Sequence, residues 1–206
     1  MTPVHLEERP DLALIADMIE SGARVLDLGC GTGALLAWLA AHKGVNGYGL
    51  EIDPLNISTC IERGVNVLEQ NLDDDLSAFE TGGFDVVVMT ETLQAVRRPD
   101  RVLEEMLRIA PRGIVTFPNF AHWRIRAQLA LRGRMPMNDA LPHAWYDTPN
   151  IHLCTFDDFE TLCSDTGIRI NARTVVDRDY RSRPLLDALP NLFGTIAIYG
   201  LGRDRL

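Results

Sequence analysis

The segment VLDLGCGTG, residues 25–33, joins a short apolar run to a glycine-rich turn. Glycines allow a tight turn, and they let a ligand approach the backbone closely. Gly29, Gly31 and Ala34 also satisfy the dinucleotide pattern G-x-G-x-x-G/A. The turn therefore predicts a nucleotide-type ligand, but it does not distinguish one such ligand from another.

Asp27, two residues before the first glycine, favours one kind of ligand. A carboxylate in a low-dielectric crevice repels the pyrophosphate group of NAD. S-adenosylmethionine carries a sulfonium and an ammonium against one carboxylate, so its methionine end has a net positive charge. Because an acid beside the loop attracts that end, we expect S-adenosylmethionine or S-adenosylhomocysteine as the ligand.

A second acid, Glu51 in GYGLEID, lies 24 residues after Asp27. An acid at the end of this strand can accept hydrogen bonds from both ribose hydroxyls, although NAD enzymes use the same device. Asp53 competes for the role, but it precedes Pro54 and is expected to cap the following helix. Asn71 stands where class I methyltransferases often place an Asp that meets the adenine amino group, and its side-chain carbonyl can accept the same bond. The predicted cofactor-binding residues are Asp27, Gly29, Cys30, Gly31, Gly33, Glu51, Ile52, Asn71 and Leu72.

No residue is identified as a catalyst of methyl transfer. The segment MTETLQAV, which follows the fourth predicted strand, lacks the N-P-P-Y motif that grips a planar nitrogen, and its polar candidates are Glu91 and Gln94. His143 and His152 have no third ligand at metal spacing, so no metal site is expected. The other polar and aromatic candidates follow the fifth predicted strand: Asn119, His122, Trp123, Arg124, His143, Trp145, Tyr146, Asp147 and His152.

These residues are positioned by alternating strands and helices, the pattern of βα units on a parallel sheet. The predicted strands span residues 24–28, 47–52, 66–69, 84–89, 113–117, 168–176 and 195–201. The predicted helices span residues 10–19, 33–41, 54–62, 99–109, 122–131 and 156–165. The fold class is α/β, a three-layer Rossmann-like class I methyltransferase fold with a mostly parallel seven-stranded sheet. Residues 73–75, all Asp, are expected to form a helix start and a solvated turn rather than ligand groups.

Length and composition set outer limits on the function. The 206 residues suit a single domain, 1–206, with an insertion at residues 119–153 after the fifth strand. The net charge of -9 disfavours a nucleic-acid binder, although arginines between residues 97 and 134 leave open a local basic face or a solvated helix face. Four cysteines without C-x-x-C spacing are expected to be reduced structural thiols. An acidic N-terminus and the lack of a run of about 20 apolar residues predict a cytoplasmic protein with no membrane span.

The insertion has two interpretations. Trp, Tyr and Arg in a long loop match the composition of protein-interface hot spots. Alternatively, Trp123, Ile125 and Leu129 form one packed stripe of a helix.

Several segments together resemble one known family. GYGLEID, RGVNV, RRPDRVLEEMLR, RGIVTFPNFAHWR, RGRMP and WYDTPNIHLCT are similar to sequences of the MetW family of bacterial methionine biosynthesis proteins, from about Arg24 to Arg173. The resemblance implies a methyltransferase fold in a partner that homoserine O-acyltransferase needs for full activity. It assigns cofactor contact to Asp27, the loop glycines and Glu51, and it assigns no methyl-transfer catalyst; Asn71 departs from the usual Asp.

Three functions therefore stay open at this point. The first is an activating partner of homoserine O-acyltransferase that docks through residues 119–153, with S-adenosylmethionine as a signal from the end of the pathway. The second is a working methyltransferase on a small metabolite, and the third, disfavoured by Asp27, is an NAD-dependent oxidoreductase. A degenerate site that binds nothing and self-association of the chain also stay open.

Overall fold

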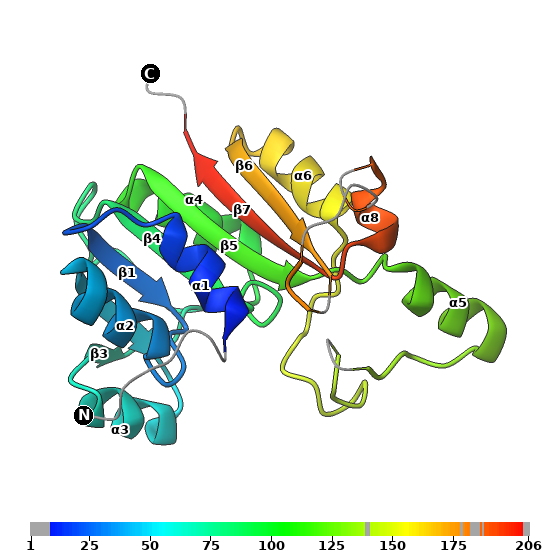
Figure 1. Cartoon of the computed structure of the whole chain (residues 1–206), viewed down its shortest axis with the longest axis horizontal. Helices are drawn as coiled ribbons and strands as arrows, with labels where there is room; N and C mark the ends of the chain where they lie inside the picture. The colour runs from blue at the N-terminus through cyan, green and yellow to red at the C-terminus, as the bar shows by residue number, and fades with distance from the viewer. Residues whose placement is uncertain (1–8, 139–140, 178, 182–185, 187, 204–206) are drawn as a thin grey trace.

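The computed structural model describes residues 9–138, 141–177, 179–181, 186 and 188–203, and these contain one seven-stranded sheet (Figure 1). The strand order is β3-β2-β1-β4-β5-β7-β6, in which β7 runs antiparallel to β5 and β6 and the other pairs are parallel. The predicted mostly parallel, Rossmann-like sheet is confirmed. The strands are β1 (Arg24–Leu28), β2 (Asn46–Glu51), β3 (Asn66–Glu69), β4 (Val86–Thr90), β5 (Arg112–Pro118), β6 (Arg169–Val176) and β7 (Ile196–Gly202).

Helices cover both faces of the sheet and complete three layers. Successive residues of a strand point to opposite faces, and in β1 Val25 packs with α1, α2 and α3 while Leu26 packs with α4 and α6. Val86 and Val87 divide in the same way on β4. The helices are α1 (Pro10–Asp17), α2 (Ala34–Lys43), α3 (Pro54–Glu62), α4 (Pro99–Ile109), α5 (Trp123–Arg132), α6 (Phe156–Asp165) and the short α8 (Pro190–Phe193).

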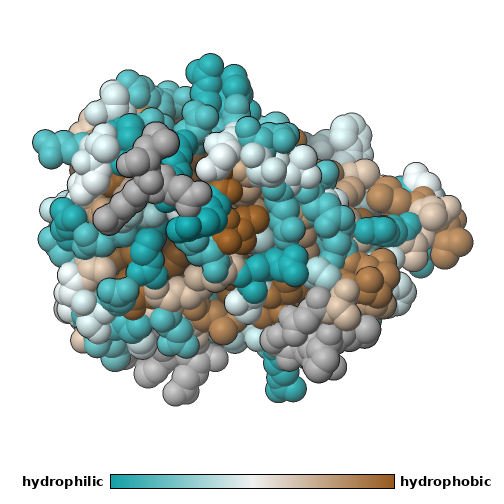
Figure 2. Space-filling view, turned by 90° about the horizontal axis from the view of Figure 1, so that it is seen from above, coloured by the Kyte–Doolittle hydropathy of each residue, from teal (hydrophilic) through white to brown (hydrophobic). Residues whose placement is uncertain are grey.

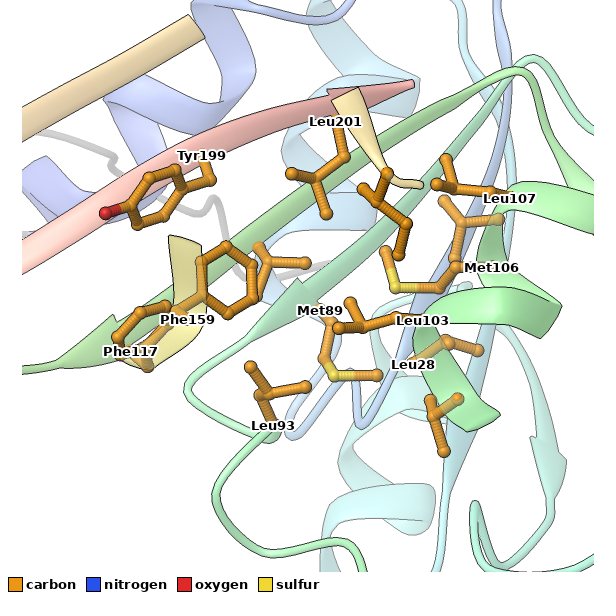
Figure 3. Close-up of a cluster of buried hydrophobic side chains, with 14 of the residues drawn as sticks. Leu28, Met89, Leu93, Leu103, Met106, Leu107, Phe117, Phe159, Tyr199 and Leu201 are labelled. Carbon is orange, nitrogen blue, oxygen red and sulfur yellow. The ribbon is translucent and has the colours of Figure 1, made fainter. Parts of the chain in front are cut away.

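The larger apolar core lies on the α4 and α6 face (Figure 3). Phe159 of α6 packs between Phe117 of β5 and Tyr199 of β7, with ring centroids 4.9 and 4.7 Å away. Leu93, from the turn after β4, lies in the same core, 3% exposed. This turn, which also carries polar candidates, is therefore anchored in the centre of the molecule.

All the predicted strands and helices are present, and their bounds agree with the structure to within two residues. The five ranges 24–28, 54–62, 66–69, 99–109 and 156–165 match the structure residue for residue, and the other strands and helices differ by at most two residues at either end. Two details were wrong. The short helix α8 was missed, and residues 73–75 begin no helix, although they are exposed and lie in and directly after a turn, as the second half of that prediction expects.

Between β5 and α6 the chain leaves the sheet. Helix α5 projects from the body of the molecule (Figure 1), and Gly133, whose φ is 59°, caps its C-terminal end. After α5, the described residues up to the start of α6 contain one isolated bridge, Asn138 to Leu141, and otherwise no regular element. Figure 2 shows hydrophobic surface on the protruding end of the molecule. Leu131, near the end of α5, is 85% exposed.

Four of the arginines between residues 97 and 134 form ion pairs with acids. Arg97 pairs with Asp73, Arg98 with Asp100, Arg108 with Glu105 and Arg112 with Glu20. These pairs neutralise part of the stretch. In the part of the chain that the structure describes, no helix has the length and apolar character needed to cross a membrane.

Candidate functional site

The predicted nucleoside site lies where the strand order changes direction. From β1 the chain proceeds to β2 on one side, whereas β4 occupies the other side. In open α/β sheets, ligands bind outside the carboxyl ends of the strands at such a switch point. Asp27, the glycine turn and Glu51 all come from this edge, on adjacent parallel strands.

The glycine turn is fixed on β2 and leaves space above its backbone. The amides of Gly29 and Cys30 both donate to the carbonyl of Leu50, at 2.9 and 3.0 Å. Gly31 has a φ of 53°, which favours glycine, and a Cβ built there would meet nothing within 4 Å. The turn thus offers open backbone to a ligand, as the sequence predicted for a nucleotide-type site.

Asp27 is a buried carboxylate with an unsatisfied oxygen. It is 3% exposed, and its Oδ1 has no hydrogen-bond partner in the described part of the protein. Burial, and to a lesser degree the charge of Glu51, raises the pKa of Asp27 to about 7. A buried orphan acceptor costs free energy unless a ligand satisfies it. A cationic ligand group would remove this cost.

Asp53 caps α3, as the sequence predicted, while Glu51 remains the candidate acid for the ribose. Oε1 of Glu51 accepts from the backbone amides of Ile52 and Asp53, at 2.7 and 2.9 Å. These bonds orient the carboxylate and use one of its two oxygens. The side chain of Asp53 accepts instead from the amide of Leu55, at 2.9 Å, and caps α3.

At the predicted adenine end of the site, the polar side chains are engaged by hydrogen bonds within the protein. Asn71 follows β3, and its Oδ1 accepts from the backbone amide of Asp73 at 3.0 Å, so a local turn occupies this acceptor. Leu72 is buried and Ile52 is exposed. Asp73 binds the backbone amide of Arg97 at 2.7 Å, which gives it a structural role.

Cys30 packs with a second thiol beneath the turn. Its Sγ lies 3.8 Å from Sγ of Cys60, which donates to the carbonyl of Gly31 at 3.2 Å. Burial raises the pKa of both thiols, so both are neutral at pH 7. The two cysteines are 30 residues apart in sequence, and no local pattern predicts their contact.

Charged and polar groups that sequence reasoning missed lie beside Glu91. Glu91 has a φ of 53° and is exposed as a residue, but the protein around its carboxylate desolvates that group and raises its pKa. Asp11 adds to this effect, whereas Arg9, which pairs with Asp11 at 2.6 Å, opposes it. Tyr180, with a φ of 56°, lies within electrostatic range of Glu91. Because these residues come from three distant segments, the sequence gives no signal for their meeting.

The two ends of the insertion meet at one residue of the turn after β4. Gln94 is 2% exposed, and its Nε2 donates to the carbonyl of Pro118 at 3.3 Å and to Sγ of Cys154 at 3.2 Å. Its backbone carbonyl accepts from the amides of Ile151 and His152, at 2.9 and 3.0 Å. We call this group the neck: Gln94, Pro118, Phe120, Ile151, His152 and Cys154.

Several predicted candidates of the insertion have structural roles. Asn119 donates to the carbonyls of Asn191 and Gly194, both at 3.0 Å, and ties the end of β5 to α8. His122 caps α5 by accepting from the amide of Arg124 at 3.3 Å. His152 lies 3.3 Å from the carbonyl of Arg97. These residues hold the chain in place.

Other candidates are exposed. Ile125 packs in the interior, but Trp123 is 45% exposed under the guanidinium of Arg124, so the expected packed stripe was wrong for Trp123. Trp145 and Tyr146 are 73% and 77% exposed, and their rings contact each other edge to face. Asp147 bonds through its backbone to Ala144.

Trp145 and Tyr146 border a hollow of about 550 Å³. We call it the apolar hollow, and it is lined by Phe120, Met135, Pro136, Leu141, His143, Trp145, Tyr146, Thr148, Asn150, Ile151 and Leu153. His143 and His152 belong to no group of three potential metal ligands among the described residues. Most of the side chains that line the hollow are apolar, and a few polar groups stand among them.

Comparisons with known proteins agree with the fold and name a family. Residues 9–201 match the protein family described as methionine biosynthesis protein MetW. The bifunctional methionine biosynthesis protein MetXA/MetW of Rhodopirellula baltica is 33% identical over 211 residues, which cover 98% of this chain and 34% of that protein. The chain thus spans about a third of the length of this relative.

Solved structures of methyltransferases share the fold. An S-adenosylmethionine-dependent methyltransferase of Mesorhizobium loti has a TM-score of 0.68 at 17% identity, with 95% of this chain and 97% of that chain covered. The magnesium protoporphyrin IX methyltransferase of Synechocystis, solved with bound S-adenosylhomocysteine, has a TM-score of 0.65 at 17% identity, with 95% and 81% covered. These likenesses confirm the predicted class I methyltransferase fold.

Proposed function

Since the chain belongs to the MetW family of methionine biosynthesis proteins, we propose that it binds S-adenosylmethionine and acts as an activating partner of a homoserine O-acyltransferase. The single observation that carries the partner role is the fused relative, in which a MetW part and a MetXA part share one chain. Fusion places two proteins permanently side by side. For this protein, the proposed partner is a MetX-like acyltransferase in the cytoplasm.

The residues at the switch point fit S-adenosylmethionine. The orphan oxygen of Asp27 receives the positively charged methionine end, the open backbone at Gly31 admits close approach, and Glu51 presents a carboxylate oxygen to the ribose. The proposed contacts are Asp27, Gly29, Cys30, Gly31, Gly33, Glu51, Ile52, Asn71 and Leu72. When bound, S-adenosylmethionine supplies an activated methyl group, and the residues of this chain hold and orient it.

The apolar hollow supports docking of the acyltransferase. Contiguous exposed apolar surface on a protein commonly marks an interaction site, and exposed Trp and Tyr side chains are enriched among interface hot spots. Trp145 and Tyr146 have both properties. We place the partner on this part of the insertion, within a single domain of residues 1–206.

The experiment is co-expression with the homoserine O-acyltransferase of the same cell. We expect the two proteins to purify together and the acyltransferase rate to rise when this chain is present. If the acyltransferase neither purifies with the chain nor changes in rate, the proposed partner role is wrong.

A second candidate function is methyl transfer to a small metabolite. The observation in its favour is Glu91, an exposed residue whose carboxyl pKa is raised by desolvation and which lies near Arg9 and Tyr180. A carboxylate with a raised pKa suits a general base better than an ordinary one. Release of S-adenosylhomocysteine with candidate acceptors, lost in Glu51→Ala, would establish this activity.

A further inference from the structure

The neck joins both ends of a surface segment to one buried amide. Gln94 holds Pro118, just before the insertion, and Cys154, just after it, with the same Nε2. The amide of Phe120 also donates to the carbonyl of Cys154 at 3.1 Å. Because one residue binds both ends, a displacement of Gln94 moves the entry and exit of the insertion together.

Gln94 is connected in the other direction to the glycine turn. It lies two residues after Thr92, whose carbonyl accepts from the amide of Ala95 at 2.9 Å and closes a turn around Gln94. Thr92 packs so tightly against Gly29 that a Cβ there would lie 2.8 Å from Cγ2 of Thr92. A ligand that shifts the glycine turn therefore presses on the turn that carries Gln94.

The neck also forms part of the apolar hollow. Phe120 and Ile151 belong to both groups, and Leu153 lines the hollow between the neck residues His152 and Cys154. The width of the hollow thus depends on where the neck holds these side chains. Closely packed interiors transmit small displacements because they leave little empty space to absorb them.

The amide of Gln94 has one unsatisfied atom. Its Oε1 is buried without a hydrogen-bond partner among the described residues. A buried unsatisfied acceptor is costly, and a displacement of the turn that brings a donor to it is favoured. The neck therefore has a physical reason to adopt a second arrangement.

We infer that Gln94 is a positioning residue that couples occupancy of the nucleoside site to the shape of the apolar hollow. This inference rests on the proposed function, and it deepens that function by naming the route between ligand and partner. Binding at Asp27 and the glycine turn moves Thr92, Gln94 transfers the movement to both ends of the insertion, and the hollow changes its fit to the acyltransferase.

The test measures amide hydrogen exchange without the partner. S-adenosylhomocysteine is the probe, its binding is measured by calorimetry, and exchange is followed at Ile151 and His152, whose amides donate to Gln94. We expect saturation to change exchange at these amides by about three-fold or more in the wild-type protein. In Gln94→Met, which keeps the side-chain volume but removes the donor, we expect ligand binding without this change.

Two further variants separate coupling from general damage. Gln128→Met makes the same chemical change on α5, outside the neck and the hollow, and is expected to keep the wild-type response. Cys154→Ala removes only one partner of the Gln94 amide, keeps the bond to Pro118 and is expected to reduce the response. A purely structural role for Gln94 predicts faster exchange with and without the ligand but an unchanged ligand-dependent ratio.

The outcomes distinguish this inference from the proposed function. If S-adenosylhomocysteine binds but exchange at Ile151 and His152 does not change, the coupling is wrong while ligand and partner binding stand. An unchanged response in Gln94→Met rejects Gln94 as the route. Failure of S-adenosylhomocysteine or S-adenosylmethionine to bind overturns the proposed ligand and the coupling with it.

Discussion

The switch point of the sheet and the insertion differ in the polarity and the burial of their candidate binding groups. At the switch point, the candidate binding groups are polar and buried, and the clearest example is Asp27, whose Oδ1 has no hydrogen-bond partner among the described residues. In the insertion the groups are apolar and exposed, as Trp145 and Tyr146 are. A buried orphan oxygen suits a small charged ligand, whereas an exposed apolar surface suits another protein.

The two regions also differ in how the backbone holds them. The glycine turn is bound to β2 by consecutive amides, within a sheet that packs on both faces. The insertion is held at its ends by the neck and by Asn119, and between α5 and α6 its described residues contain one isolated bridge and otherwise no regular element. Ligand binding at a rigid site can therefore have its largest structural effect at a distant, weakly held one.

The largest expected effect tests the insertion. The double variant Trp145→Ala with Tyr146→Ala should weaken acyltransferase binding by roughly 2–4 kcal/mol, because such residues dominate interface energies. Since both side chains are exposed, the free energy of unfolding should change by less than about 0.5 kcal/mol. Calorimetric titration of the acyltransferase and denaturant unfolding measure the two quantities.

A matched control for this variant lies on α3. Leu55 is 79% exposed, as Tyr146 nearly is, but it is far from the insertion in sequence and belongs to neither the neck nor the hollow. Leu55→Ala should leave acyltransferase binding unchanged. Equal losses from both substitutions would mean that the hollow is not the docking surface.

The next effect tests the switch point. Asp27→Asn should weaken S-adenosylmethionine binding by roughly 1.5–3 kcal/mol, the usual range for a lost charged hydrogen bond. Acyltransferase binding in the absence of ligand should stay as in the wild-type protein. Ligand affinity that survives this substitution would remove Asp27 from the site and end the contrast between the two regions.

The raised pKa of Asp27 also predicts that ligand affinity depends on pH. Because the pKa of Asp27 is raised to about 7, ligand affinity should increase by about ten-fold from pH 6 to pH 8 as the carboxylate ionises. The difference between wild type and Asp27→Asn isolates this residue from titration of the ligand itself. If ligand affinity depends on pH equally in wild type and Asp27→Asn, another titrating group causes the pH dependence.

The stability of the ligand-free protein should have the opposite dependence. A carboxyl whose pKa is higher when folded holds its proton better in the folded state, so the stability it contributes falls as the pH rises from about 4 to about 7. Asp27→Asn should therefore be more stable than the wild-type protein at pH 8. Denaturant unfolding at pH 5 and pH 8 measures this difference.

The sequence predicted the switch point better than the insertion, and the reason is the range of the interactions. The glycine turn, the cap at Asp53 and the strand bounds follow from neighbours within a few residues. The neck joins Gln94 to Pro118 and Cys154 across 24 and 60 residues, and no local periodicity reports such a contact. The packing of Cys60 under Gly31 and the meeting of Glu91 with Tyr180 depend on the completed fold in the same way.

The exposure of Trp123 was also beyond a local pattern. Its spacing to Ile125 and Leu129 fits a helix, and the helix is present. Which side of the helix is buried depends on what packs against it, and α5 projects from the body with only Ile125 fully buried. Helical spacing predicts a helix, but only the tertiary structure decides whether the apolar stripe is covered.

The smallest expected effect distinguishes the roles of two neighbouring acids at the switch point, Asp53 and Glu51. Asp53→Ala should lower the free energy of unfolding by about 1 kcal/mol, because it removes the cap of α3. It should change S-adenosylmethionine affinity by less than about two-fold, because the bond from Asp53 to Glu51 uses the backbone amide, which the substitution keeps. In Glu51→Gln, the loss of free energy of S-adenosylmethionine binding should exceed the loss of free energy of unfolding. If the effects on ligand affinity are reversed, Asp53 and not Glu51 holds the ribose, and the acid that the sequence assigned to the helix belongs to the site.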